Sequence, residues 1–498
     1  MFEQLAGDGH FVQDGDGTFE LYERRVTAAD GHVTERTTYQ FTIPWFTWVF
    51  ALPVRLALAR RIHAGRRGTP HLGTPWWAPP DRLTPRQLSV IGLLAAASMS
   101  SAFINTLFTQ TAEFAADDFG VGKSGIGIGG AVVRAGIVLV LPIAGLGDRI
   151  GRRRVIVGLA YAAPIVSALG AVAPTFPLLV ASQTLGRPLG LALDFMVAVV
   201  ATEEMPRNSR AYAVSVLAMA SGLGAGVAIF ALPLADLSAS AWRFVYLVAL
   251  VWLVVAIDIA RRLPETRRFE RPHVIAPPID RRRLAIVGAI ALLGNLFIAP
   301  ASLFQNGYLK DERGFSATMI AVFTIVTATP AFIGLVIGGR VADMRGRRHI
   351  IAITVPIGAA FAVVSYSLGG PPMWLSVFLA ATIGSIAFPA IAVYRTELFP
   401  TGNRSRASGL LTAAALLGGI VGLLVMGALL DEGYSHGVVM GGLAPAQLAV
   451  VAVVLLWLPE TAHQELETLN PLDAVRGEVS AADAAALTHD DPRRGSPA

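Results

Sequence analysis

Twelve apolar segments fill the chain between residues 88 and 458 and leave it little choice of fold. Each is long enough to cross a bilayer, which takes about 20 mostly apolar residues in a helix. Charged residues make up only 15% of the 498 residues, against about 25% in soluble proteins, and the mean hydropathy is +0.57. The sequence therefore predicts an all-α polytopic membrane protein with twelve transmembrane helices. The predicted spans are residues 88–110, 123–146, 155–173, 176–201, 211–234, 243–262, 284–306, 316–340, 349–369, 373–394, 407–430 and 438–458.

The loops between these spans differ in charge from one side of the membrane to the other. The loops on one side hold 21 arginines, whereas those on the other side, together with the first residues of the spans that follow them, hold four basic residues. Because positively charged loops stay in the cytoplasm, we expect both ends of the twelve-span region to be cytoplasmic. The arginine-rich loops are residues 147–154, 203–210, 261–283, 340–348 and 395–406.

Three short patterns recur along the chain at an offset of 194 or 195 residues. Such a repeat indicates two six-helix copies in parallel orientation, as in transporters whose halves rock about a central site. We expect an N-terminal six-helix bundle at 88–262, a cytoplasmic central loop at 263–283 and a C-terminal six-helix bundle at 284–458. The matched patterns are Asp148-Arg149-Ile150-Gly151-Arg152-Arg153 with Asp343-Met344-Arg345-Gly346-Arg347-Arg348, Glu203-x-x-Pro206-x-x-x-Arg210 with Glu397-x-x-Pro400-x-x-x-Arg404, and Pro264-Glu265-Thr266 with Pro459-Glu460-Thr461.

The two ends of the chain are of a different character. Residues 1–40 are an acidic extension without the apolar stretch of a signal peptide, and their alternation around Asp30-Gly31 predicts a β-hairpin. Residues 41–60 are apolar but interrupted by prolines, which favours an interfacial helix on the inner leaflet; an extra span that puts the extension outside is the alternative. Residues 61–87 are predicted to be a cytoplasmic linker, and residues 459–498 a polar cytoplasmic tail.

Several kinds of chemistry find no support in the composition. The chain has no cysteine, and its nine histidines are scattered without the paired spacing of a metal site. The glycines of residues 125–130 follow no strand, so they are not a dinucleotide-binding loop. We therefore expect no cofactor, no metal and no nucleic-acid partner. Only Lys123 and Lys310 of the 40 basic residues are lysines, a usage typical of GC-rich bacteria, so a bacterial inner membrane is the expected location.

The first repeated pattern resembles the signature loop of the major facilitator superfamily, which reads roughly G-x-L-A-D-R-x-G-R-R. The first copy here has its initial glycine shifted by one position, and the second copy lacks the arginine after the aspartate. The resemblance covers about residues 84–470. It implies that these loops gate the cytoplasmic side, with a carboxylate held against arginines and helix ends; positive-inside anchoring is the alternative for the arginines. The implied gating residues are Asp148, Arg149, Gly151, Arg152, Arg153, Asp343, Gly346, Arg347 and Arg348.

The other two patterns resemble the sugar-porter and metabolite:proton symporter branches of that superfamily. In those branches the matching groups form a cytoplasmic charge network. Span 7 lacks the glutamine pair of sugar porters, and span 5 lacks the proline of the drug:proton antiporter glycine run. Both departures favour uptake of a metabolite other than a sugar. The implied network is Glu203, Arg210, Glu265, Glu397, Arg404 and Glu460.

Three ionisable residues lie inside predicted spans of the first bundle, where a charge indicates a function unless it is paired. At the helical rise per residue, Arg134 and Arg187 lie roughly 21 Å and 24 Å from the inner face, and Asp194 roughly 13 to 14 Å. Two arginines at similar depth can hold an organic anion. Asp194 shares a helix face with Arg187 and is the predicted proton carrier, and Arg187-x-x-Gly190 resembles a superfamily motif implicated in proton coupling. A structural Arg–Asp bridge is the alternative.

Polar side chains elsewhere in the spans give weaker signals. Asn105 and Gln110 in span 1 and Asn295 in span 7 are candidate substrate contacts. Glu113, at the mouth of span 1, is interpreted as a solvated acid at a loop edge. Asp258 is expected to pair with an arginine four residues on. The glycines of spans 2, 5, 8 and 11 are expected to allow close helix packing.

These features together predict a secondary transporter that works by alternating access and carries a small polar metabolite with a proton. The two arginines within the membrane favour an organic anion. The expected partners are the small-molecule substrate, the proton and the lipid bilayer, and the chain is expected to be a monomer and not an enzyme. Proton-driven efflux of drugs or metabolites and sugar uptake are the alternatives. A membrane-embedded enzyme and a membrane sensor are more distant ones, the latter suggested by the N-terminal extension.

Overall fold

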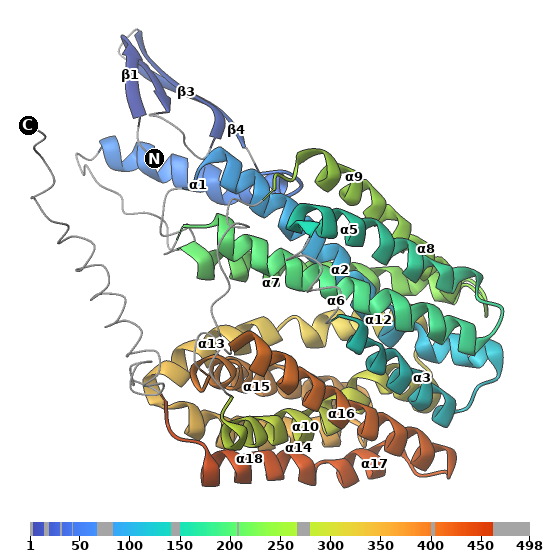
Figure 1. Cartoon of the computed structure of the whole chain (residues 1–498). Helices are drawn as coiled ribbons and strands as arrows, with labels where there is room; N and C mark the ends of the chain where they lie inside the picture. Colours follow the sequence, from blue (N-terminus) through green and yellow to red (C-terminus); the bar gives the residue numbers. More distant parts are fainter. Residues whose placement is uncertain are drawn as a thin grey trace, which may run out of the picture. The chain divides into compact units, whose positions relative to one another are not determined.

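The computed structural model describes residues 3–13, 19–29, 32–41, 43–66, 83–140, 150–206, 209–265, 279–399 and 404–461. Helices form most of it, and a small antiparallel sheet lies near the N-terminus (Figure 1). The chain divides into two compact units. Unit 1 is Met1–Thr111 with Gly136–Arg271, and unit 2 is Ala112–Ala135 with Pro272–Ala498.

Four antiparallel strands in the order β1-β2-β3-β4 form the sheet of the N-terminal extension. A register irregularity after Phe19 lets Phe19 and Tyr22 share the buried face of the sheet, with ring centroids 5.6 Å apart. The alternating pattern in the sequence corresponds to the last two strands, and two shorter strands precede them. The strands are β1 (Glu3–Gly7), β2 (His10–Gln13), β3 (Phe19–Ala29) and β4 (His32–Phe41).

Helix α1 (Thr47–Arg66) follows the sheet and carries exposed apolar side chains along one stripe. Trp48, Leu52 and Leu56, each four residues from the next, are all exposed, a spacing that suits a helix lying on a membrane surface. Just before the helix, Trp45 Nε1 donates to Asp258 Oδ2 at 3.0 Å. Asp258 also forms the expected i,i+4 pair with Arg262, at 2.8 Å. The start of α1 is thereby tied to the end of span 6 within unit 1.

The other helices of unit 1 come from the first sequence repeat, and short 3₁₀ turns join several of them into continuous spans. They are α2 (Pro85–Phe119), whose last turns belong to unit 2, η1 (Gly136–Leu139), α5 (Arg152–Ala168), η2 (Leu169–Val172), α6 (Phe176–Glu204), α7 (Arg210–Ala231), η4 (Leu232–Asp236), α8 (Trp242–Leu247), η5 (Val248–Val251) and α9 (Trp252–Arg262).

Unit 2 contains one helix of the first repeat, α3, and the helices of the second repeat. They are α3 (Lys123–Ala135), α10 (Arg281–Leu303), α11 (Gln305–Gly307), the π-helical turn η6 (Tyr308–Glu312), α12 (Ala317–Ala328), α13 (Ala331–Arg345), α14 (Arg347–Ser365), α15 (Gly370–Glu397), α16 (Arg404–Asp431), α17 (His436–Leu443) and α18 (Pro445–Trp457).

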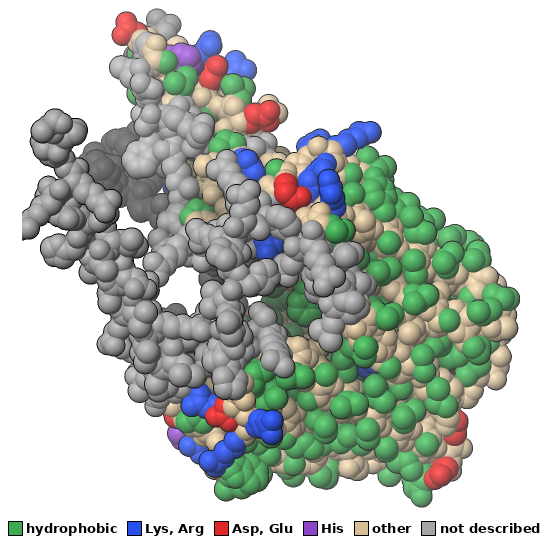
Figure 2. Space-filling view, in the orientation of Figure 1, with side chains coloured by type: hydrophobic (Ala, Val, Ile, Leu, Met, Phe, Trp, Pro, Cys, Tyr) green, Lys and Arg blue, Asp and Glu red, His purple; other side chains and the backbone are tan. Residues whose placement is uncertain are grey.

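Eleven helical stretches among the described residues are long and apolar enough to cross a membrane. They correspond in order to the first predicted span and to the third through the twelfth. The predicted second span, 123–146, contains α3 and η1 and then enters residues 141–149, which lie outside the described part. Hydrophobic side chains cover the flanks of the helices on the face drawn in Figure 2. These findings confirm the predicted all-α polytopic fold.

Glycines bring several helices together at backbone distance. An ideal Cβ on Gly418 of α16 would lie 1.9 Å from Leu292 O of α10, and one on Gly422 would lie 2.2 Å from Leu296 O. Gly224 of α7 approaches the backbone of α2 in the same way, at 2.1 Å. Because no side chain fits in these positions, the glycines of spans 5 and 11 serve helix packing, as predicted.

The same device explains why residues 112–135 pack within unit 2 although they belong to the first repeat in sequence. An ideal Cβ on Gly127 of α3 would lie 2.5 Å from Leu423 O of α16, and one on Gly427 would lie 2.7 Å from Lys123 O. Small residues on both helices thus let α3 lie along α16. Residues 112–135 were expected in the N-terminal bundle at 88–262, but this packing of α3 on α16 places them in unit 2 instead of unit 1.

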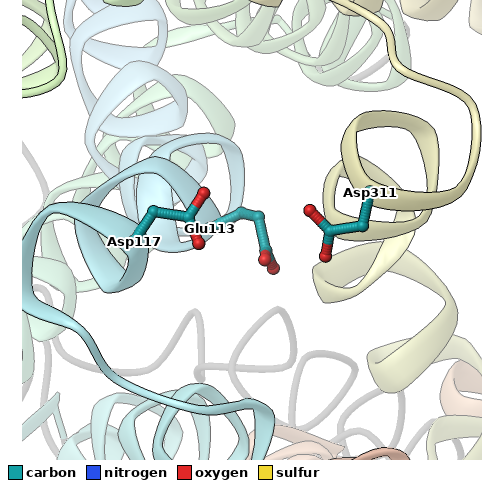
Figure 3. A group of neighbouring side chains, drawn as sticks. All are labelled: Glu113, Asp117 and Asp311. Carbon is teal, nitrogen blue, oxygen red and sulfur yellow. The ribbon is translucent and has the colours of Figure 1, made fainter.

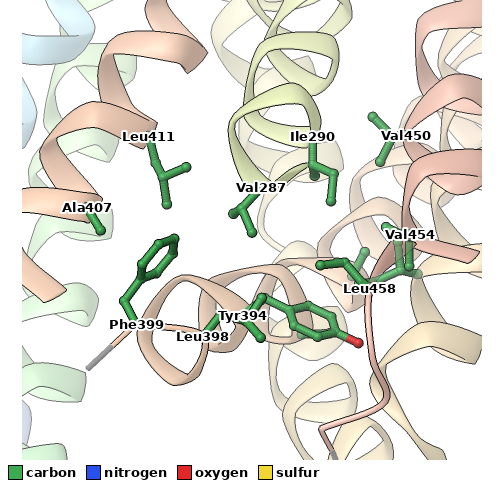
Figure 4. Close-up of a cluster of buried hydrophobic side chains, with 13 residues drawn as sticks. Val287, Ile290, Tyr394, Leu398, Phe399, Ala407, Leu411, Val450, Val454 and Leu458 are labelled. Atoms are coloured by element: carbon green, nitrogen blue, oxygen red, sulfur yellow. The ribbon is translucent and has the colours of Figure 1, made fainter. Parts of the chain in front are cut away.

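A cluster of buried apolar side chains closes one end of unit 2 (Figure 4). Tyr394, Leu398 and Phe399, at the end of α15, pack there with residues of α10, α16 and α18. The Tyr394 hydroxyl donates to Pro459 O at 3.0 Å. This hydrogen bond fixes the chain where it leaves α18, one residue before Glu460.

Replacing Gly418 with alanine should destabilise unit 2, because the new Cβ would overlap Leu292 O. We expect a loss of about 1–3 kcal/mol in the free energy of unfolding, measured by thermal denaturation of the detergent-purified protein. Gly226→Ala in α7 is the matched control, since nothing lies within 4 Å of its Cβ position. Equal melting temperatures for the two variants would contradict the packing argument.

Candidate functional site

Two glycines in the signature patterns share a left-handed backbone conformation. Gly151 has φ 98° and Gly346 has φ 94°, and each directly precedes a helix, α5 or α14. A residue with a side chain would be strained there. An ideal Cβ on Gly346 would also lie 2.8 Å from Glu460 Oε2, and one on Gly151 would lie 3.0 Å from Glu265 Oε2. The geometry therefore requires glycine at both positions.

A glutamate from each Pro-Glu-Thr pattern caps the helix that follows the glycine. Glu265 Oε1 accepts from the backbone N–H groups of Arg152 and Arg153, at 3.1 Å each. Glu460 accepts from the first two N–H groups of α14, at 2.9 and 3.1 Å. A carboxylate in this place satisfies amides that have no partner within the helix and interacts favourably with the helix dipole. The sequence assigns these two glutamates to a charge network. In the structure their carboxylates bind backbone N–H groups of the arginines that begin each helix.

The arginine side chains next to the caps repeat the same contacts. Arg153 Nη2 donates to Ala260 O at 2.7 Å, and Arg348 Nη2 donates to Leu455 O. Both the two arginines and the two acceptors are 195 residues apart. The repeat in the sequence is therefore a repeat of the same hydrogen bonds, each set lying within one unit.

Other residues of the predicted gate and network fall where the structure gives no side-chain geometry, so their roles stay predictions. Two lie outside the described residues, namely Asp148 and Arg149. Five lie in helices without described side chains, namely Glu203, Arg210, Asp343, Glu397 and Arg404.

A polar pocket of about 320 Å³ opens between α2, α6 and α7 in unit 1. Asp194 Oδ1 of α6 accepts from Ser98 Oγ of α2 at 2.8 Å, and Ser98 Oγ lies 3.1 Å from Ser221 Oγ of α7. The three helices therefore meet at one carboxylate. The lining residues are Ser101, Ala102, Asn105, Thr106, Asp194, Ser221, Gly222 and Ala225.

Asn105 brings an unused acceptor into this pocket. Its Nδ2 donates to Ser101 Oγ at 3.3 Å, while its Oδ1 is buried without a hydrogen-bond partner among the described residues. A buried acceptor without a partner is unfavourable, so a ligand that donates a hydrogen bond there would be stabilised. The structure thus brings two predicted site residues, Asn105 and Asp194, into one pocket. Gln110 lies farther along α2 and does not line it.

The serines in and beside this pocket, Ser98, Ser101 and Ser221, were not among the predicted site residues. Ser98 and Ser101 lie seven and four residues before Asn105, on the same face of span 1. A search for small polar residues at this spacing would have found them. Ser221 of α7 gave no such signal, because its contact with α2 depends on how the helices pack.

Asp194 does not pair with Arg187. The described residues include no ion pair of Asp194, whose carboxylate bonds to Ser98 instead, so the alternative of a structural Arg–Asp bridge is not found there. Arg187 precedes Pro188, which lacks the N–H group that would bond to Thr184 O. Gly136 packs against that carbonyl, with an ideal Cβ position 2.5 Å away.

Arg134 lies on α3 in unit 2, beside a glycine of α16. An ideal Cβ on Gly419 would lie 3.4 Å from Arg134 Nη1. No hydrogen bond or ion pair among the described residues involves Arg134, so its partly buried guanidinium is available to an anion. In the same unit, Asn295 donates to Ala291 O of its own helix at 3.2 Å, and Gln447 donates to Gly294 O at 3.1 Å.

The interpretation of Glu113 as a solvated loop-edge acid is wrong. Its side chain is buried, with 2% of the residue exposed, and it bonds to Lys123 Nζ. The short turn between α2 and α3 brings the lysine, ten residues on, back to the acid. Contact between the two could not be inferred from helix spacing, because they lie on different helices.

Comparison with known proteins places this architecture in a family. The sequence model of the Major Facilitator Superfamily matches residues 92–283 and again residues 284–477. The match in two copies agrees with the internal repeat.

Several of the relatives are named as transporters. The chain is 25% identical over 348 residues to a probable 4-methylmuconolactone transporter of Cupriavidus pinatubonensis, a match that covers 66% of this chain and 80% of the relative. It is 28% identical over 357 residues to the 3-(3-hydroxy-phenyl)propionate transporter of Escherichia coli, covering 66% and 84%. Among solved structures, the xylose transporter XylE from E. coli shares the fold, with a TM-score of 0.65 at 15% identity, over 78% of this chain and 99% of that one.

Replacing Glu460 with alanine should lower the stability of the protein, because the start of α14 loses its acceptor. We expect a loss of about 1–2 kcal/mol, with Glu460→Gln in between because its amide oxygen still accepts hydrogen bonds. Thermal unfolding in detergent measures the effect. Glu432→Ala removes an exposed glutamate as the control, and an equal effect of the two alanine variants would argue against capping.

Proposed function

Because this chain belongs to the Major Facilitator Superfamily, we propose that it carries small organic anions into the cell together with protons. It is a multi-pass membrane transporter of small molecules. Alternating access of a site between the two repeats is the mechanism that this architecture serves. The location in a bacterial inner membrane, with both ends of the twelve-span region cytoplasmic, and the monomeric state belong to the same proposal and rest on loop charge and composition.

Arg134 is the observation that carries the choice of an anion. A guanidinium within a span, without an ion pair among the described residues, is costly unless water or a ligand compensates its charge. A carboxylate fits this role, because it can accept two parallel N–H bonds from one arginine. The absent side chain of Gly419 leaves room beside Arg134 Nη1. One relative is named for a propionate, which supports a carboxylate as the cargo.

Asp194 is the proposed proton carrier. Its carboxylate bonds to a serine hydroxyl and not to a cation, so a proton on Asp194 does not have to break an ion pair. The pocket beside it provides access for the substrate, with Asn105 Oδ1 as a free acceptor. A carboxylate that is neutralised before the helices move avoids carrying a bare charge through a dry site.

The proposed activity can be tested with labelled organic acids in proteoliposomes. Uptake of aromatic and other carboxylates should follow an imposed proton gradient, inside alkaline, and collapse when a protonophore is added. The corresponding neutral amides should not be transported, because they offer Arg134 no charge. Xylose uptake under the same gradient, without uptake of any acid, would contradict the proposal.

Arg134→Ala should reduce acid uptake at least about tenfold, since a bidentate charged hydrogen bond contributes well over 1 kcal/mol. Arg134→Lys keeps the charge and should retain part of the activity. Glu432→Gln, at an exposed site, is the control for expression and reconstitution. Wild-type uptake by Arg134→Ala would remove this residue from the substrate site.

Asp194→Asn should still exchange labelled for unlabelled substrate but should no longer accumulate it against a gradient. The asparagine keeps the hydrogen bond with Ser98 and cannot take up a proton. Counterflow and gradient-driven uptake, measured on the same vesicles, separate the two steps. Full accumulation by this variant would exclude Asp194 as the proton carrier.

A further inference from the structure

Both lysines of the chain lie in one cluster of charges within unit 2. Lys123 Nζ bonds to Glu113 and, at 2.5 Å, to Asp311, while Lys310 Nζ bonds to Asp117. The three carboxylates come from the end of α2 and from η6 and point toward the same space (Figure 3). The other 38 basic residues are arginines, so this cluster is where the chain uses an ammonium group.

The backbone of Gly307 lies close against this cluster. An ideal Cβ at this position would lie 2.5 Å from Glu113 Oε2 and 3.3 Å from Lys123 Nζ. An ammonium group fits in so narrow a place better than a planar guanidinium does. The three acids offer oxygens that lie within 4.8 Å of one another, so they repel unless cations lie between them, and the two lysines supply these cations.

Two further polar contacts lie at the same end of unit 2. Asp431, at the end of α16, accepts from the backbone N–H groups of Lys123 and Ser124, at 2.8 and 2.9 Å, and so caps α3. His436 Nδ1 lies 2.5 Å from Glu312 Oε1, which holds α17 to η6.

The contacts that matter for movement join the two sequence repeats. Residues 113–124 belong to the first repeat, whereas residues 310–431 belong to the second. Three contacts cross between them, namely Lys123 with Asp311, Lys310 with Asp117, and Asp431 with the start of α3. Any motion that separates the ends of α2 and α3 from η6 and α16 must break all three contacts.

We propose that Lys123, Glu113 and Asp311 form a latch that holds the two repeats together on the outer side during one part of the transport cycle. The latch rests on the proposed function, because alternating access requires the repeats to separate on one side at a time. Loop charge puts residues 111–122 and 307–315 outside. An exposed ion pair contributes little to the folding stability of a protein. A network of ion pairs that forms in only one conformation nevertheless shifts the equilibrium toward that conformation, by the difference in its energy between the two conformations.

The test measures opening to the outside without using a substrate. The natural chain has no cysteine, so Ala225→Cys, in the lining of the polar pocket, gives a single reactive thiol. Its rate of reaction with a membrane-impermeant maleimide, added to intact cells, reports how often the pocket opens outward. Lys123→Ala should raise this rate at least about fivefold, the lower end of typical coupling between two sites.

Matched variants separate the latch from general damage. Arg243→Ala removes a cation whose side chain donates to two carbonyls of unit 1, and it should label at the parental rate. Asp311→Asn keeps the contact between Lys123 and Glu113 and removes a half-exposed partner, so it should fold and still label faster. The exchange of Lys123→Glu with Glu113→Lys should label more slowly than either single variant.

Parental labelling rates in both Lys123→Ala and Asp311→Asn, at normal protein levels in the membrane, would overturn the latch. An exchange variant that labels as fast as its single variants would do the same. Because labelling needs no substrate, failure of the proposed function is recognised separately. In that case no organic acid is taken up, while the labelling rate still depends on Lys123.

Discussion

Each repeat of this chain closes on itself through one glutamate that binds the start of a helix. Glu265 and Glu460 hold the first amides of α5 and α14, and the glycines with positive φ before those helices leave room for the carboxylates. Further contacts lie beside this one: Arg153 bonds to Ala260 O near the end of the last span of its repeat, and the Tyr394 hydroxyl bonds to the carbonyl of the residue before Glu460. Without the cap, buried helix ends would keep unpaired amides, which is costly near a bilayer.

The apolar surroundings make every unpaired polar group informative. Many hydroxyl groups in the described spans bond to a carbonyl one turn earlier in their own helix, as Thr106 and Thr184 do. Such a hydroxyl needs no hydrogen-bond partner from a neighbouring helix. Against this background Asn105 Oδ1 and the Arg134 guanidinium stand out, because neither has a partner among the described residues. Each unit thus contains one candidate group that the fold leaves without a partner among the described residues, Asn105 in unit 1 and Arg134 in unit 2.

Features that depend on local sequence could be predicted, whereas contacts between distant segments could not. Hydropathy and loop charge indicate the spans, and the constant offset between the motifs reveals the repeat. Each of these signals depends only on residues that are close together in the sequence. Asn105 and Asp194 could be proposed because a polar group in a span is unusual anywhere. Ser98 with Ser221, and Glu113 with Lys123 and Asp311, depend on which helix faces meet. Glycine contacts set those faces, as between α3 and α16, and periodicity does not identify the partner helix of a glycine.

The two ends of the spans use charge in opposite ways. At one end the described contacts of Glu265 and Glu460 stay within one repeat, so a movement of the repeats as rigid bodies would leave them intact. At the opposite end, Lys123, Lys310 and Asp431 make contacts from one repeat to the other, which any separation of the repeats at that end would have to break. Rigid-body movement needs both properties: strong contacts inside each moving part, and a limited set between the parts that can be exchanged. Backbone caps suit the first role because they are lost only when a helix end unravels. Pairs of flexible, partly exposed side chains suit the second, because water replaces each broken contact at little net cost.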